Sequence, residues 1–161
     1  MFDAAVTNAS PLIYLGRTGN IHLLQHCARD VSVPDAVVHE IRAAGTDDAA
    51  AQAMDTCAWL QVVSVSTVPP QIAAWNLGIG ESAVLAWAVA NPGTWAIIDD
   101  LEGRRCASQL RIRVVGTLGL VLAAKRRGTI PTARAVIEAL IGSGLYLSDD
   151  VVADALALVG E

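Results

Sequence analysis

The chain has 161 residues, of which 53% are hydrophobic, and a formal net charge of −5. This length suits one domain with a complete core, and the longest uninterrupted apolar run, 83–90, is too short to span a membrane. The three cysteines are odd in number and lack CxxC spacing, which argues against a disulfide framework and a zinc site. No basic and apolar leader opens the sequence, so we expect a cytoplasmic protein without a signal peptide and without membrane association.

Short apolar and β-branched runs alternate with helical patterns along the chain. The runs typical of strands are 4–7, 31–33, 60–65, 95–98 and 112–115. Strands that are separated by helices predict a parallel sheet with helices on both faces, which is an α/β fold.

Turn and capping residues mark the helices between these strands. A helix of 34–42 begins at a proline, and a helix within 46–59 begins at Thr-Asp-Asp, which supplies an N-cap and an acidic first turn. Gly-Ile-Gly-Glu opens a helix at 78–91, which Asn-Pro-Gly ends. A further helix of 117–127 ends at a glycine.

Two more helices are expected near the end of the chain, at 132–141 and 149–158, joined by Gly-Ser-Gly. Thr132 and Ser148 are their predicted N-caps.

The whole chain, 1–161, is expected to form one domain. No repeat, low-complexity tract or linker divides the sequence. The alternating strands and helices occupy a core of 1–128, and 129–161 form a C-terminal helical extension of it.

The charges are unevenly distributed. Residues 1–100 carry three basic and ten acidic groups, whereas 101–130 carry seven basic groups and one acidic group. The basic segment is either an ordinary solvated helix face or a local patch that attracts phosphate, since such a field acts locally even in an acidic protein.

Acidic and amide side chains stand at the places where the predicted sheet would bind a ligand. Asn8 directly follows the first strand, and Asp99 and Asp100 directly follow the fourth. Glu40 lies near the middle of the helix after the second strand, and Glu81 lies in the first turn of the helix opened by the glycine pair. Ligands of open parallel sheets bind outside the carboxyl ends of the strands.

Two interpretations of these five residues stay open. Each residue can serve structure alone, by capping a helix, stabilising a turn or lying on a solvated face. If they converge, their carboxylates repel one another unless protons or cations separate the charges. Such a cluster is expected to recruit Mg²⁺ or Mn²⁺, which commonly act on phosphates.

A resemblance to a known family rests on four segments of the sequence: TNASPLIYLGRTG, VSVPDAVVHEI, LGIGESAVLAWA and AIIDDLEGRRCASQLRIRVVGTLGLVLAAKRRGTIP. In this order they resemble the PIN domain superfamily, in particular its PilT-like branch of small prokaryotic nucleic-acid-binding proteins, which is VapC-toxin-like. The resemblance covers essentially the whole chain. It implies a three-layer α/β/α sandwich around a parallel sheet and an Mg²⁺- or Mn²⁺-dependent endoribonuclease acting on single-stranded RNA. It also implies a homodimer and, often, a toxin that a small antitoxin neutralises.

The resemblance further implies which residues form the site. Asn8 occupies the place of the first acidic ligand, and the last acidic position falls on Asp99 or Asp100, with the register slightly favouring Asp100. The implied metal ligands are Asn8, Glu40, Glu81, Asp99 and Asp100, of which Glu40, Glu81 and Asp100 are the implied catalytic residues.

Nucleic-acid contacts are expected next to these ligands. Ser10 lies in the same turn as Asn8, and Arg104 and Arg105 are placed to position or neutralise the strand. The helix start at Thr117 offers backbone N–H groups to a phosphate. Among the aromatic side chains, Trp75 is the one we expect to be exposed for contact with RNA or a partner protein.

Asn8 departs from the usual pattern of the family, which carries aspartate at this position. An amide oxygen can still bind Mg²⁺, but it supplies no formal charge, so metal affinity should fall. An alternative function therefore stays open beside the nuclease: a catalytically weakened or inactive PIN-fold module that binds RNA or a partner protein.

Overall fold

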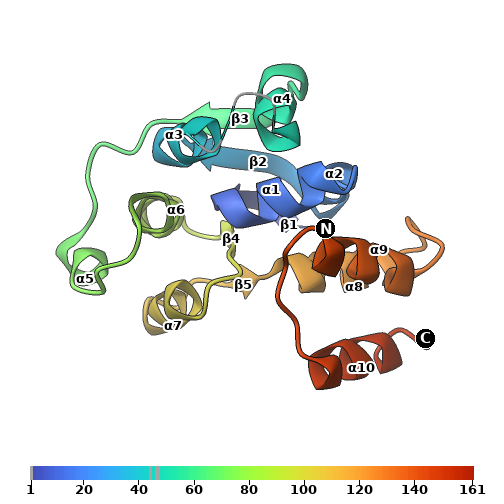
Figure 1. The fold of residues 1–161 in the computed structure, drawn as a ribbon. Helices are drawn as coiled ribbons and strands as arrows, with labels where there is room; N and C mark the ends of the chain where they lie inside the picture. Colours follow the sequence, from blue (N-terminus) through green and yellow to red (C-terminus); the bar gives the residue numbers. More distant parts are fainter. Residues whose placement is uncertain (1, 44, 46–47) are drawn as a thin grey trace.

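Apolar segments pair side by side as parallel strands at the centre of the molecule. In the computed structural model, which describes residues 2–43, 45 and 48–161, the strands are β1 (Phe2–Thr7), β2 (Ala28–Pro34), β3 (Leu60–Val63), β4 (Trp95–Ile97) and β5 (Val114–Val115). Among these described residues they form a five-stranded sheet in the order β3-β2-β1-β4-β5 (Figure 1). Every pairing is parallel, as predicted, although β3 and β5 are shorter than the predicted runs 60–65 and 112–115.

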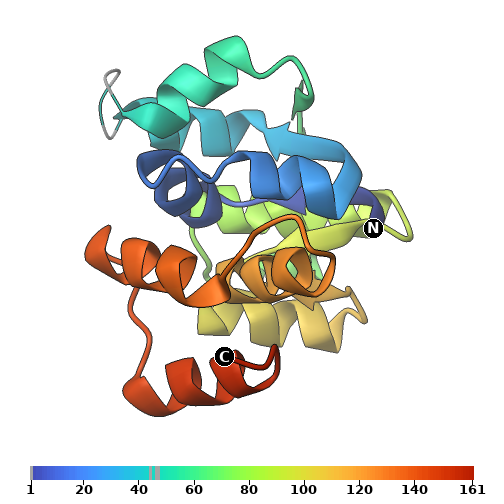
Figure 2. The ribbon, with the colours of Figure 1, turned by 90° about the vertical axis from the view of Figure 1, so that its right-hand side faces the viewer.

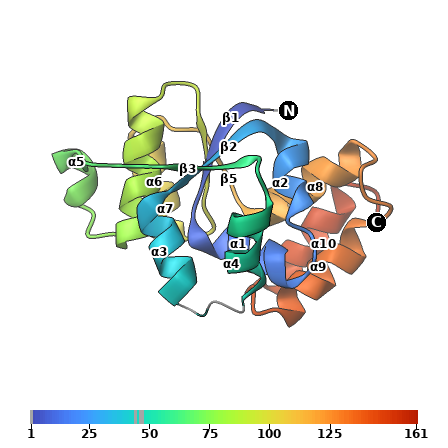
Figure 3. The same ribbon diagram turned by 90° about the horizontal axis from the view of Figure 1, so that it is seen from above.

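Helices cover both faces of this sheet. They are α1 (Ala9–Arg17), α2 (His22–Cys27), α3 (Asp35–Ala43), α4 (Ala49–Thr56), α5 (Pro70–Ala73), α6 (Ile79–Ala90), α7 (Leu101–Gln109), α8 (Thr117–Arg126), α9 (Ala133–Gly142) and α10 (Asp149–Ala157). Seen from above, α3, α5, α6 and α7 lie on one side of the sheet, and α1, α2, α4, α8, α9 and α10 lie on the other (Figure 3). The predicted three-layer α/β/α sandwich with C-terminal helices is confirmed.

The strand order places a crevice at the carboxyl ends of β1 and β4. From β1 the chain continues to β2 on one side of the sheet, and from β4 it continues to β5 on the other. At such a switch point the connections leave two neighbouring strands in opposite directions, and ligands of open parallel sheets bind in the opening between them. The segments that begin at Asn8 and Asp99 start at this crevice.

Large aliphatic side chains fill the space between the sheet and both helical layers. The largest fully buried ones are Leu12, Leu15, Leu23, Leu24, Ile41, Ile72, Leu85, Ile97, Ile98, Leu120, Ile137 and Leu140. Because they come from helices of both layers, packing fixes the sheet from two sides. Despite these apolar faces, none of the helices in the described ranges has the length and hydropathy needed to cross a membrane.

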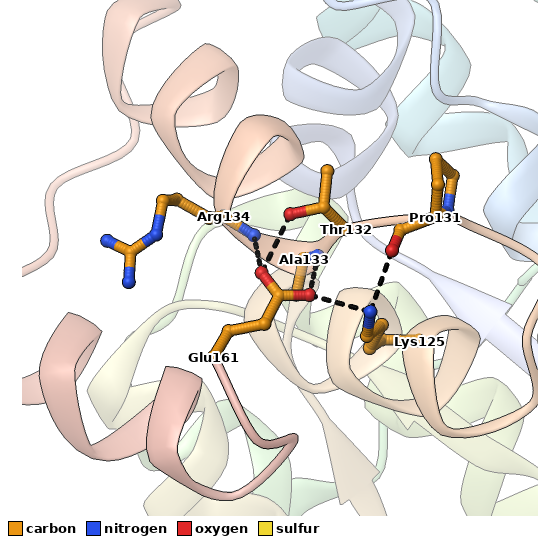
Figure 4. A network of polar contacts seen from close by, with 6 residues as sticks. All are labelled: Lys125, Pro131, Thr132, Ala133, Arg134 and Glu161. Atoms are coloured by element: carbon orange, nitrogen blue, oxygen red, sulfur yellow. Dashed lines mark hydrogen bonds and ion pairs between the residues drawn. The ribbon is translucent and has the colours of Figure 1, made fainter.

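The carboxylate of Glu161 fastens the C-terminal segment to the start of α9 (Figure 4). It accepts hydrogen bonds from the backbone N–H groups of Ala133 and Arg134, both at 2.9 Å, and from the Thr132 hydroxyl at 2.7 Å. The Lys125 ammonium lies 2.9 Å from the same carboxylate. Thr132 is the N-cap residue of α9, as predicted, but its side chain forms no cap hydrogen bond. Its hydroxyl donates to Glu161, and the Glu161 carboxylate accepts from the helix amides instead.

The other predicted caps have different outcomes. The Ser148 hydroxyl accepts a hydrogen bond from the Val151 N–H at 3.4 Å, so the predicted cap of α10 is confirmed. Thr46 and Asp47 lie outside the described residues. The adjacent Asp48 is the N-cap of α4, and its carboxylate accepts from the N–H of Ala50 at 2.9 Å.

Glu161 is expected to hold α10, the outermost helix at its end of the molecule (Figure 2), against α8 and α9. Contact with the Lys125 ammonium and the amides at the start of α9 keeps the pKa of Glu161 well below its usual range. A lowered pKa stabilises the fold above the unfolded-chain value of about 4.3, and this stabilisation is lost as the pH falls toward the folded pKa. Glu161→Gln should therefore lower the urea midpoint of unfolding at about pH 7. The midpoint of this variant should also change less than that of the native chain as the pH falls.

The matched control is Glu138→Gln, an exposed carboxylate of α9. It should leave the urea midpoint near that of the native chain. Equal midpoints for Glu161→Gln and Glu138→Gln across the pH range would show that the Glu161 contacts contribute nothing to stability.

Candidate active site

Strand pairing sets the positions of the polar residues at the crevice. The N–H of Asn8 donates to the Ile97 carbonyl at 3.1 Å, so Asn8 still lies alongside β4. One strand further, the N–H of Ile98 donates to the Val115 carbonyl at 3.0 Å. Asp99 consequently emerges beside the residues that open α8, and the ends of three adjacent strands meet at one edge of the sheet.

Helix α6 brings Glu81 to Asn8. The Asn8 side-chain amide donates to Glu81 Oε1 over a long 3.5 Å, and the second carboxylate oxygen of Glu81 accepts from the N–H of Gly78 at 3.3 Å. Glu81 thus satisfies an N–H at the start of its own helix while it faces the end of β1. The predicted neighbours Asn8 and Glu81 are in contact.

The side-chain oxygen of Asn8 has no partner among the described residues. Asn8 is only 5% exposed, and its Oδ1 is a buried acceptor that no donor reaches. A buried polar atom without a hydrogen bond costs free energy, typically about 1–3 kcal/mol. Such an atom at a strand end, next to a carboxylate, has the chemistry of a cation ligand.

The charges of the site act on Glu81. Burial raises the pKa of the Glu81 carboxyl, and the negative charges of Asp100 and Glu40 raise it further. The hydrogen bonds from Gly78 and Asn8 act in the opposite direction without cancelling this effect. Asp100 and Glu40 therefore lie close enough to Glu81 for their charges to disfavour its ionised form.

Glu40 reaches the same helix end from α3. Its Oε1 accepts a hydrogen bond from the N–H of Gly80 at 2.8 Å, in the first turn of α6. A Cβ atom at Gly80 would lie 2.5 Å from Glu40 Oε2, so only glycine allows this close approach. The exposed Glu40 side chain lies at the rim of the site, against the positive end of a helix dipole.

The two adjacent aspartates have different partners. Both oxygens of Asp99 are engaged by Thr117, whose N–H lies at 2.7 Å and whose hydroxyl lies at 2.6 Å. Asp100 caps α7 through Oδ2, which accepts from the N–H of Gly103 at 2.8 Å. Asp99 thus joins the end of β4 to the start of α8, whereas Asp100 keeps an oxygen in the exposed part of the site.

A groove of about 800 Å³ runs from these residues toward the C-terminal helices. The polar side chains that line it are those of Ser10, Glu81, Asp99, Asp100 and Arg104. Glu40 belongs to a neighbouring hollow beside Ile79 rather than to this groove.

The predicted nucleic-acid contacts have unequal access to the groove. Ser10 and Arg104 line it, whereas Arg105 forms an exposed ion pair with Glu102. Thr117 is fully buried, and its N–H and hydroxyl are already bound by Asp99, so the structure does not present that amide to a phosphate.

Aromatic residues of the groove are missing from the sequence-based prediction. Tyr14 and Tyr146 both line the groove, and Tyr146 is 89% exposed. Trp75, which is expected from the sequence to be exposed, is half-buried and packs against the core. The position of Tyr146 shortly after the Gly-Ser-Gly of 142–144 is a signal of a surface segment, but not of its place beside the acids.

The residues of the site fit a hard divalent cation held by few protein ligands. Within the described ranges, no three His, Cys, Asp or Glu side chains lie together so that they could hold a metal ion. The donors at hand are two carboxylates that line the groove, Glu81 and Asp100, and the buried, unpaired amide oxygen of Asn8 behind Glu81. Mg²⁺ typically binds to one or two carboxylates and keeps several waters, which matches this donor set.

Glu81→Gln is expected to stabilise the metal-free protein at neutral pH. The pKa of Glu81 is raised in the fold, so ionisation costs stability as the pH rises above the unfolded-chain value of about 4.3. Glutamine removes the charge and keeps an oxygen for the Gly78 amide. In EDTA, the variant should therefore have the higher denaturant midpoint at about pH 7, and the difference should shrink toward about pH 4.

The control for this measurement is Glu102→Gln, which removes an exposed carboxylate outside the groove and should change the midpoint little at either pH. A Glu81→Gln curve that runs parallel to the native curve from acid to neutral pH would contradict the repulsion described above.

One comparison identifies the family of this chain. The model of the family described as DUF3368, a PIN domain, matches residues 4–161, a range that contains every residue of the site. No curated protein matches the chain. On the family match, together with the parallel sheet and the acidic crevice at its switch point, the chain belongs to the PIN domain family.

Proposed function

We propose that this protein is an endoribonuclease that uses Mg²⁺ or Mn²⁺ to cut single-stranded RNA. Membership of the PIN family supports nuclease activity in general, and with it nucleic-acid binding and the use of divalent metal ions. A toxin role held in check by a small antitoxin is the biological setting that the family resemblance implies.

One observation carries the proposal: the buried Asn8 Oδ1 lacks a partner in the described structure, beside carboxylates that repel one another. A divalent cation provides the missing partner for the amide oxygen and neutralises the repulsion at the same time. A neutral hydrogen-bond donor does not do both, because it leaves the excess negative charge in place.

In this proposal Asn8, Glu81 and Asp100 hold the cation. When bound, it supplies Lewis-acid stabilisation for phosphodiester hydrolysis. Hydrogen bonds with the Gly78 N–H and the Asn8 amide keep Glu81 in position for this role. Arg104, which lines the groove, neutralises a phosphate of the strand.

The second candidate function is a PIN-fold module that binds RNA or a partner protein without cutting. Asn8 favours it, because an amide in place of a carboxylate removes one negative charge from the cation site. The two functions share the fold and the groove, and they differ in turnover.

Cleavage of mixed-sequence single-stranded RNA in Mn²⁺, Mg²⁺ or EDTA separates these functions. For the nuclease, we expect metal-dependent cutting that Glu81→Gln reduces by at least about 100-fold, because it removes a charged ligand of the cation. Asn8→Asp should speed the reaction by restoring a charged ligand. A silent native chain and a cutting Asn8→Asp variant would establish the binding module, and silence of both would contradict the proposed site.

The two aspartates can be separated by Asp100→Asn and Asp99→Asn. Asparagine caps a helix about as well as aspartate, so Asp100→Asn should keep the stability of the fold while weakening Mn²⁺ binding. Asp99→Asn should retain Mn²⁺ binding but lower the free energy of unfolding by about 1–2 kcal/mol, because it loses a charge-assisted contact with buried Thr117. Calorimetric Mn²⁺ titration and urea unfolding measure the two effects. The reverse pattern would assign the ligand role to Asp99.

A further inference from the structure

The groove has two ends of different chemistry. One end holds Glu81, Asp100 and Arg104, which are the groups that the proposed function assigns to a cation and a phosphate. The other end is walled by apolar and aromatic side chains of α8, the α9–α10 connection and α10: Leu118, Leu122, Leu145, Tyr146, Leu147 and Val151. An occupant that fills the whole groove therefore needs a charged part and an apolar part joined at short range.

Tyr146 is held in place by its neighbours although its own ring is solvated. Leu145 on one side is buried, and its N–H donates to the Leu140 carbonyl at 3.0 Å. Leu147 on the other side packs against the core, and the following Ser148 caps α10. The backbone is thus fixed before and after Tyr146, while 89% of the residue's surface stays exposed beside the groove.

A second tyrosine supports this segment from below. Tyr14 of α1 lines the same groove, and its Cε1 lies 3.8 Å from the position that a Cβ atom would take at Gly144. The α9–α10 connection therefore rests on α1, directly beyond the turn that carries Asn8 and Ser10. The α9–α10 connection thus passes next to the wall of the candidate active site.

A nucleotide matches both ends of the groove. Its phosphate suits the cation and Arg104, and its base is a flat ring that stacks on exposed aromatic side chains. Only an unpaired base has free faces for such stacking, since the bases of a duplex are stacked on one another.

We propose that Tyr146 stacks on one unpaired base of an RNA strand whose phosphate is bound at Arg104, beside Glu81 and Asp100. The inference rests on the proposed function and adds to it a subsite that the C-terminal extension contributes. Tyr146 contacts the base, the leucines of the groove exclude water from it, and the Glu161 contacts keep the extension in position. The extension thereby selects single-stranded over double-stranded substrate.

The test uses the full chain carrying Glu81→Gln, so that bound RNA stays intact, and a fluorescently labelled short single-stranded RNA in Mn²⁺. Fluorescence anisotropy measures the dissociation constant. Adding Tyr146→Ala should weaken binding by about fivefold or more, which corresponds to the loss of one stacked base. Tyr146→Phe keeps the ring and should bind within about twofold of the parent.

The matched control is Leu158→Ala, which removes another exposed apolar side chain of the same extension, 62% exposed and outside the groove. It should leave RNA affinity unchanged. A set of RNAs with one abasic nucleotide at successive positions then locates the base. At one position the abasic RNA should bind the parent more weakly and should abolish the difference between parent and Tyr146→Ala.

Each outcome separates this inference from the proposed function. Loss of affinity in Tyr146→Ala with coupling to one abasic position supports the subsite, even if the native chain proves unable to cut RNA. Unchanged affinity in Tyr146→Ala overturns the subsite while leaving the nuclease intact, and it favours a partner protein as the occupant of the apolar end. A uniform loss without coupling to any position overturns base stacking. If neither the Glu81→Gln parent in Mn²⁺ nor the native chain in Ca²⁺ binds RNA, both proposals are overturned.

Discussion

The parallel pairing of β1 with β4 determines where every polar group of the site lies. The two strands are neighbours in the sheet although 87 residues separate Asn8 from Trp95 in the chain, and each continues to a partner on its far side. Their carboxyl ends therefore lie at the same edge of the sheet. Helix α1 follows β1 there, and helix α7 follows β4. Asn8 and Asp100 are the last residues before those helices, so the topology alone brings an amide and a carboxylate to one crevice.

Backbone amides at helix starts make this accumulation of negative charge tolerable. Glu40 accepts from the N–H of Gly80, Glu81 accepts from that of Gly78, and Asp100 accepts from that of Gly103. Each carboxylate thereby binds a donor at the positive end of a helix, which offsets part of the repulsion and leaves further oxygens available. Capping a helix and holding a cation are thus compatible roles for the same residue, because a carboxylate has more than one acceptor site.

The sequence predicts the parts of this structure that depend on local pattern. The strands and the helix that Glu81 opens follow from apolar periodicity and from glycine and proline punctuation, which act over a few residues. Glu161, and not Thr132, accepts the hydrogen bonds of the amides at the start of α9. Local pattern cannot predict this, since Glu161 lies 29 residues after Thr132 in the chain. Asp99 and Asp100 differ for a similar reason: the partner of Asp99, Thr117, lies at the start of α8, which follows the neighbouring strand β5. The exposure of Tyr146 and the partial burial of Trp75 likewise depend on how α8, α10 and α5 pack against the core.

The amide of Asn8 changes the electrostatic balance of the site relative to a carboxylate at this position. Its amide nitrogen donates toward Glu81, and this contact favours the ionised carboxylate that burial, Asp100 and Glu40 disfavour. An aspartate at this position offers no such donor when ionised, and it places a further negative charge a few ångströms from Glu81. The native amide therefore makes the metal-free site less repulsive, while its second atom, Oδ1, remains buried and unpaired within the described structure. An amide at this position thus supplies less charge to a cation and also leaves less repulsion for the cation to relieve, so both effects weaken metal binding relative to an aspartate.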